Sequence, residues 1–246
     1  MICLFCGKDR PQSREHLWPQ WARDLLDPAD QELLVPHSIE PNGEPHTEWD
    51  SRIFSATIKG VCRPCNNGWM SELETKAKEH AAGLIRGVPQ TIEPEPQAWI
   101  ARWAYLKILL LEQVDKRQRM LSEQLYRSVF EAREMEKLRG IHVLPSSVAI
   151  NIAAYGGPRW GRYQHTGLGD KRTGEIQIFI GTLTIGRLVI QVIQNLLGPH
   201  SIDLGRPRLV RRRYASIWPA FQPLRWPPGR PMDDRELRVF EGPQVK

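Results

Sequence analysis

Four cysteines stand in two closely spaced pairs, and this spacing is the strongest chemical signal in the chain. Two residues separate Cys3 from Cys6, and two separate Cys62 from Cys65. That spacing allows a tight turn to direct both sulfurs of a pair at one tetrahedral ion, and two pairs supply four ligands. Because four thiolates leave no open coordination position, the sequence predicts a structural Zn²⁺ site and not a catalytic one.

Two alternatives for these cysteines are redox-active dithiols and the disulfides of a secreted chain. A redox dithiol needs only one pair. Disulfides require export, and the first residues, from Met1 to Cys6, lack the basic flank and the long apolar core of a signal peptide. We therefore expect a cytoplasmic protein, in which thiols stay reduced and available for metal.

Glu15, His16 and Asn66 are the candidate residues for chemistry. The first two lie in the segment Ser13-Arg-Glu-His-Leu-Trp-Pro19 between the cysteine pairs, and Asn66 directly follows the last cysteine. Taken alone, a Glu-His dipeptide is typical of a solvated surface, and Asn66-Asn-Gly68 is typical of an ordinary turn. Their placement relative to the cysteines indicates that they share one site.

Two cysteine pairs that bracket an acidic-His-x-x-Pro segment, with Asn after the last cysteine, resemble the HNH (His-Me finger) nucleases. The resemblance covers about the first third of the chain. It implies a ββα-metal unit in which Glu15 and Asn66 bind a catalytic Mg²⁺ or Mn²⁺ ion through oxygen, and His16 deprotonates the attacking water. The implied function is a metal-dependent endonuclease that hydrolyses phosphodiester bonds in DNA.

Two positions depart from the pattern of that family. Glu15 stands where Asp is more usual, and the stretch from Ser55 to Gly60 lacks the Asn that orients the general base. Thr57 or a backbone carbonyl would have to orient the imidazole instead. These departures favour a second hypothesis, a catalytically inactive, zinc-stabilised protein that binds nucleic acid or has a regulatory role. A third possibility is a protein-interaction role for the C-terminal part.

A basic cluster near the C-terminus is the second candidate for a contact with nucleic acid. The chain carries a formal net charge of +6, which fits a polyanionic partner but also ordinary solubility. Arginines close to Tyr214 and Trp218 suit phosphate contacts with base stacking, although a solvated charged face is the alternative. The cluster consists of Arg206, Arg208, Arg211, Arg212 and Arg213.

The chain of 246 residues is too long for a bare zinc module, and its composition changes near residue 87. Residues 1–86 are predicted to form the zinc-stabilised HNH-like module, ending in a helix that begins near Trp69. Three prolines between Gly87 and Pro96 indicate a domain boundary. Residues 87–246 are predicted to form a C-terminal α+β domain of unknown role, so the predicted fold class is α+β.

The elements expected in this second part follow from periodicity and residue type. No apolar run is long enough to cross a bilayer, so we expect no membrane partner. The tail from Pro207 is expected to be mostly irregular. Together with the zinc module, this tail with its Trp-Pro turns resembles that of larger HNH-like proteins of bacteria and their phages. The predicted elements are helices at 98–113 and 122–139 and the strands of a small antiparallel sheet at 148–155, 175–183 and 187–194.

Overall fold

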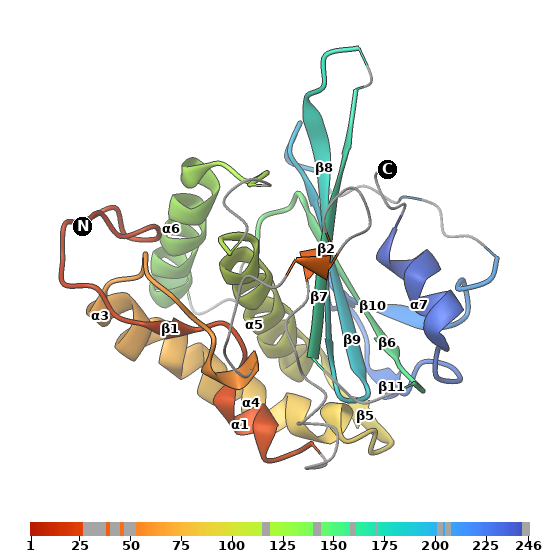
Figure 1. Cartoon of the computed structure of the whole chain (residues 1–246). Coiled ribbons are helices and arrows are strands. Elements are labelled where there is room, and N and C mark those ends of the chain that lie inside the picture. Colours follow the sequence, from red (N-terminus) through yellow and green to blue (C-terminus); the bar gives the residue numbers. More distant parts are fainter. Residues whose placement is uncertain are drawn as a thin grey trace.

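The computed structural model combines helices with one large antiparallel sheet (Figure 1). It confirms the predicted α+β class. The residues that the structure describes are 1–26, 38–39, 45–46, 53–114, 119–139, 144–157, 161–170, 172–200, 204 and 208–242.

The N-terminal part consists of short elements that lead into one long helix. The extended segment that contains β1 (Glu15–His16) runs antiparallel to β4 (Thr57–Ile58), with Glu15 opposite Ile58 and His16 opposite Thr57. The other elements are α1 (Gln20–Arg23), β2 (Ser38–Ile39), β3 (Pro45–His46), η1 (Ile53–Ser55), α3 (Arg63–Cys65), the π-helical turn η2 (Asn66–Met70) and α4 (Ser71–Ile85).

The large sheet has five antiparallel strands in the order β10-β6-β9-β8-β7. A two-residue turn at Gly186 and Arg187 joins β8 to β9, and Gly186 has a φ of 56° that favours glycine. The strands are β6 (Val148–Ala154), β7 (Gly161–Gly169), β8 (Ile176–Ile185), β9 (Leu188–Asn195) and β10 (Tyr214–Trp218).

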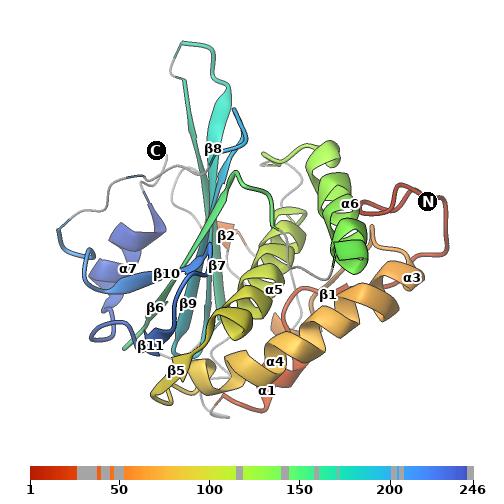
Figure 2. The same ribbon diagram turned by 180° about the vertical axis from the view of Figure 1, so that it is seen from behind.

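Helix α5 (Pro94–Glu112) lies between this sheet and the N-terminal part (Figures 1 and 2). It is buried along most of its length because it packs against the sheet on one side and against α4 on the other. A Cβ atom at Gly181 would lie 2.5 Å from Ile108 Cγ2, so this glycine permits the close approach of α5 to β8. Helix α7 (Asp234–Glu241) lies on the opposite face of the sheet.

The two parts of the chain share one hydrophobic core. One cluster of buried side chains includes Phe5 and Trp69 from the first part and Trp103, Ile190 and Trp226 from the second. The residues at the expected boundary pass directly into β5 (Gln90–Ile92), which pairs with β11 (Leu224–Trp226). Residue 87 therefore lies at a connection between packed elements, and the division of the chain into two domains stays a prediction.

Most of the predicted elements are confirmed within a few residues. Helix α5, α6 (Glu123–Arg139) and strands β6, β8 and β9 match the predicted ranges. More than half of the described tail lies outside helices and strands, as expected, but β10, β11 and α7 also lie within it and were not predicted, and the sequence reading also missed β7. Strands β10 and β11 form because each has a pairing partner far away in the sequence, whereas β7 pairs with β8, the next strand along the chain. None of the helices in the described ranges combines the length and apolarity needed to cross a membrane.

Candidate functional site

The two cysteine pairs meet because the first residues of the chain run beside residues 56–63. The Leu4 amide donates to the Gly60 carbonyl at 2.9 Å, and the Ser13 amide donates to the Val61 carbonyl at 2.9 Å. Gly7, with a φ of 65°, follows the first pair, and its amide donates to the Cys3 carbonyl at 3.0 Å to close the turn. The second pair lies around the start of α3, where Cys65 and Asn66 both donate backbone hydrogen bonds to the Cys62 carbonyl.

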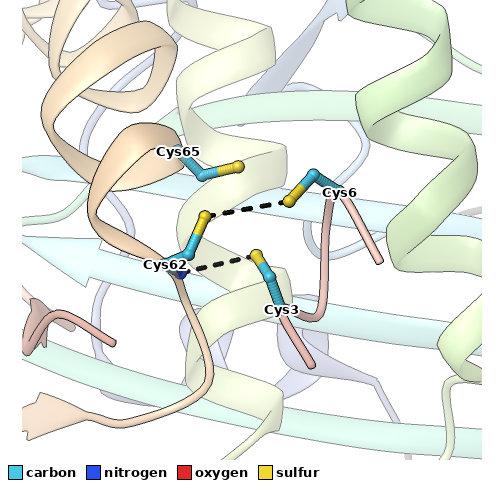
Figure 3. Close-up of side chains that lie close together, drawn as sticks. All are labelled: Cys3, Cys6, Cys62 and Cys65. Carbon is cyan, nitrogen blue, oxygen red and sulfur yellow. Dashed lines mark hydrogen bonds between the residues drawn. The ribbon is translucent and has the colours of Figure 1, made fainter. Parts of the chain in front are cut away.

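All four sulfur atoms lie within 4.8 Å of one another, and none forms a disulfide (Figure 3). The Cys6 and Cys62 sulfurs are 3.7 Å apart. Tetrahedral bonds of about 2.3 Å to one zinc ion would place sulfurs about 3.8 Å apart. The cluster is therefore compatible with a structural metal site such as zinc, and it brings together the four cysteines that the sequence predicts as ligands.

Aromatic side chains pack beside the cysteine cluster. The ring of Phe5, which stands inside the first cysteine turn, makes edge contacts with Trp69 and Tyr126 at centroid distances of 5.5 and 5.8 Å. A hydrogen bond with Cys65 lowers the pKa of the Cys3 thiol to about 4, while the same contact raises the pKa of Cys65. The cluster thus favours at least one thiolate, the form of cysteine that binds metal.

A second site, which we call the Glu15 pocket, lies on the neighbouring face of the same helical segment. Its volume is about 350 Å³, and it contains all three residues that the sequence predicts to be catalytic. They come from β1 and from the first residue of η2, which are distant in sequence. The lining residues are Glu15, His16, Gln20, Trp21, Asn66, Met70, Ser71, Glu74, Thr75 and Lys78.

The His16 ring is held by Gln20 and not by Thr57. The Gln20 amide nitrogen lies 2.9 Å from His16 Nε2. An amide NH₂ group can only donate, so Nε2 is the acceptor of this hydrogen bond. Thr57 stands opposite His16 in the strand pair, and the ring has no hydrogen bond with it among the contacts of the described residues.

Asn66 uses its amide nitrogen to join the pocket to the segment before β1. Nδ2 donates to Ser13 Oγ at 2.8 Å and to the Arg14 carbonyl at 3.5 Å. No residue within the described ranges donates a hydrogen bond to Oδ1 of Asn66. This oxygen is therefore available for an ion or a ligand.

Glu15 makes a contact that its sequence neighbourhood does not indicate. Its carboxylate is buried, and Oε1 lies 3.1 Å from Nζ of Lys107 on α5. The same ammonium lies 2.9 Å from Glu74 Oε2 and donates to the backbone carbonyl of His16 at 3.0 Å. Lys107 thus joins β1, α4 and α5, and only 1% of its side chain is exposed.

The charges in this group stabilise one another. Burial alone would lower the pKa of Lys107, but Glu74 and Glu15 outweigh that effect and raise it, so the ammonium is charged at neutral pH. Burial raises the pKa of Glu15, and Lys107 opposes this rise. Two carboxylates and one ammonium leave a net charge of −1, which still attracts a cation.

Glu15 and Asn66 are residues of this pocket whose oxygens could bind a divalent ion. No hydrogen bond reaches Oε2 of Glu15 from any described residue, and Glu15 lines the pocket together with Asn66. Carboxylate and amide oxygens are ligands of Mg²⁺ and Mn²⁺. These two donors supply only part of a coordination sphere, so solvent or substrate would have to complete it.

The predicted arginine cluster lies apart from the Glu15 pocket. The turn that contains Arg208, Arg211 and Arg212 leads into β10, and these three side chains are exposed. The Arg213 guanidinium instead pairs with buried Glu236 of α7 at 3.2 Å, on the opposite face of the sheet from α5. Arg206 lies outside the described residues. The contact of this cluster with nucleic acid stays a prediction.

No protein-family model matches this chain, and neither the curated proteins nor the solved structures contain a match.

Sequence reasoning missed Gln20 and Glu74, which line the pocket, and Lys107, which lies behind it. Gln20 carries a weak signal, because it stands four residues after His16. Lys107 carries a stronger one, since it is the lone charge in the run Ala104-Tyr-Leu-Lys-Ile-Leu-Leu-Leu111. A lysine in such a buried helix requires a carboxylate partner, although the sequence does not say which one.

Proposed function

We propose that this protein is a metal-dependent endonuclease that hydrolyses phosphodiester bonds in DNA, with its active site in the Glu15 pocket and a structural Zn²⁺ ion at the cysteines. The observation that carries the proposal is the convergence of Glu15, His16 and Asn66 on one pocket beside the cysteine cluster. The positions of the three residues relative to the cysteines already indicate a shared site from sequence alone. Their meeting in one open pocket supports a shared chemical role.

Two groups would share the chemistry, a general base and a metal ion that acts as a Lewis acid. His16 would accept a proton from a water molecule as its oxygen attacks phosphorus, and the bond from phosphorus to the leaving oxygen would break. For this step the Gln20 amide must give way to water at Nε2, which an exposed side chain on a four-residue helix can do. A Mg²⁺ or Mn²⁺ ion bound by Glu15 and Asn66 would neutralise charge on the leaving oxygen.

Exposed basic side chains around the pocket favour a polyanionic substrate. Lys78 lines the pocket itself, and Arg14 and Arg63 are exposed on the segments that carry Glu15 and Asn66. Such side chains bind phosphates without reading base sequence. We therefore propose that the substrate backbone lies across this face, with the arginine turn at 208–213 as a separate contact surface.

A cleavage assay tests the proposal directly. The zinc-loaded protein is incubated with supercoiled plasmid and linear duplex DNA in the presence of Mg²⁺ or Mn²⁺. We expect cleavage that His16→Ala reduces about 100-fold or more, the usual contribution of a general base. His80→Ala, which changes a histidine of α4 that does not line the pocket, should retain wild-type activity. Absence of cleavage with every metal, or equal cleavage by His16→Ala, would overturn the proposal.

The second candidate is a protein that binds nucleic acid without cleaving it. The pairing of Glu15 with Lys107 favours this alternative, because an ammonium already compensates the carboxylate that a catalytic ion would need. The same incubations decide between the two functions when gel-shift measurements accompany them. Salt-sensitive binding with no cleavage under any metal would support the second candidate.

A further inference from the structure

Lys107 occupies the centre of a small oxygen cage. Its Nζ lies 3.1 Å from Glu15 Oε1, 2.9 Å from Glu74 Oε2 and 3.0 Å from the His16 carbonyl oxygen. An ammonium group has three N–H bonds, and this cage supplies one acceptor for each. Two carboxylates and a backbone carbonyl are also the ligand types that hard divalent ions prefer.

The position of the cage links this cation to the candidate active site. Glu15 and Glu74 both line the pocket, whereas the Lys107 side chain is only 1% exposed and lies behind them. With Oε1 taken by Lys107, Glu15 can offer only Oε2 to an ion in the pocket. The ammonium also reduces the charge of the two carboxylates from −2 to −1, which weakens the attraction of a second cation.

We propose that Lys107 is a built-in cation that sets the affinity of the Glu15 pocket for a divalent ion. It fills the place of an oxygen-bound cation between the two carboxylates and keeps metal binding in the outer pocket weak. The inference rests on the proposed function for the role of the ion, but it concerns metal affinity and not cleavage. If Lys107 served only to hold α5 against β1, its removal would disturb the Glu15 pocket. The affinity of the pocket for a divalent ion would then fall.

Titration with Mn²⁺, followed by electron paramagnetic resonance of the free ion, separates these two roles in the full zinc-loaded chain. We expect Lys107→Ala to bind Mn²⁺ about ten-fold more tightly than the wild type or better, because the vacated cage then adds two oxygens and a net charge of −2. Lys107→Arg, which retains the positive charge, should stay close to the wild type. Lys76→Ala removes an exposed lysine of α4 that does not line the pocket and should change the affinity less than about three-fold.

A second variant keeps the test decisive if Lys107→Ala does not fold. Glu74→Gln removes one carboxylate charge at a partly exposed position and leaves Lys107 paired with Glu15, so Mn²⁺ affinity should fall about three-fold or more. Unchanged or weaker Mn²⁺ binding by folded Lys107→Ala, or unchanged binding by Glu74→Gln, would overturn the inference. Failure of the wild type to cleave DNA would overturn the proposed function alone. The Mn²⁺ affinities of the variants would still test the role of Lys107.

Discussion

The cysteine cluster and the Glu15 pocket lie on one helical segment, but their charges are compensated in different ways. The four sulfurs make hydrogen bonds with one another and with a backbone amide, so their thiolate forms depend on a metal from solution. The two carboxylates of the pocket instead hold Lys107 between them. We infer that the first cluster needs its ion to fold, whereas the second is stable without one.

Metal removal should therefore have its largest effect at the cysteines. A structural zinc ion contributes on the order of 10 kcal/mol to folding in small zinc domains. Because the cysteines belong to the core that both parts of the chain share, their loss should destabilise the whole molecule. We expect a strong zinc chelator to lower the melting temperature by about 20 °C or more, as measured by calorimetry.

Variants at the cluster provide the control for this experiment. Cys65→Ser should lower the melting temperature even with excess zinc, whereas Ser71→Ala at the exposed start of α4 should leave it unchanged. Mg²⁺ removal should also leave it unchanged, since Lys107 already compensates Glu15. A melting temperature that depends on Mg²⁺ and not on the chelated metal would contradict this prediction. It would mean that the Glu15 pocket, and not the cysteine cluster, needs its ion for stability.

The next largest effect should come from breaking the Lys107 cage. Lys107→Met retains the apolar stem but leaves two carboxylates without their cation, and loss of one partner of a buried ion pair typically costs about 3–5 kcal/mol. Lys76→Met is the matched control, because Lys76 pairs with Glu79 at 3.4 Å on the exposed side of α4. That exposed pair contributes less than about 1 kcal/mol. Urea unfolding measures both, and equal effects would contradict the buried ion pair.

The cysteine cluster could be predicted from sequence because its ligands come in short pairs. The spacing of Cys3 with Cys6 and of Cys62 with Cys65 fixes each half of the site locally, and tetrahedral geometry requires the halves to meet. The same argument predicts that His16 and Asn66 lie close to each other, because each stands on a segment next to a cysteine pair. Their roles stay predictions, because convergence on a pocket does not test chemistry.

The Lys107 cage and the C-terminal strands could not be predicted in the same way. Lys107 lies 92 residues from Glu15 in sequence, and its partner is decided by how α5 packs between the sheet and α4. Strand β7 contains glycines and polar residues that do not alternate clearly, and it forms because β8 offers a complete edge for pairing. The contact that decides the Lys107 cage is distant in sequence, whereas β7 pairs with the next strand along the chain and was missed because its own residues carry no clear strand pattern.

Glu241 offers a third buried carboxylate with which to compare the pocket. Its side chain is 1% exposed, and Oε2 pairs with Arg162 at 2.9 Å, but no described residue forms a hydrogen bond with Oε1. Glu15 has a fully buried ammonium as its partner, whereas the Arg162 side chain is 30% exposed. Burial therefore raises the pKa of Glu241 to about 7, from an ordinary value of 4.5.

This difference predicts a pH dependence that the Glu241→Gln variant should remove. The folded protein binds the Glu241 proton more tightly than the unfolded chain, so stability falls as the pH rises from 4.5 to 7. Below this window both states are protonated, and above it both are ionised. The expected loss is about 3 kcal/mol at most. Urea unfolding at several pH values should show a smaller decline for Glu241→Gln, whereas Glu175→Gln at an exposed turn should keep the wild-type slope. An unchanged slope in Glu241→Gln would mean that Arg162 compensates Glu241 as fully as Lys107 compensates Glu15.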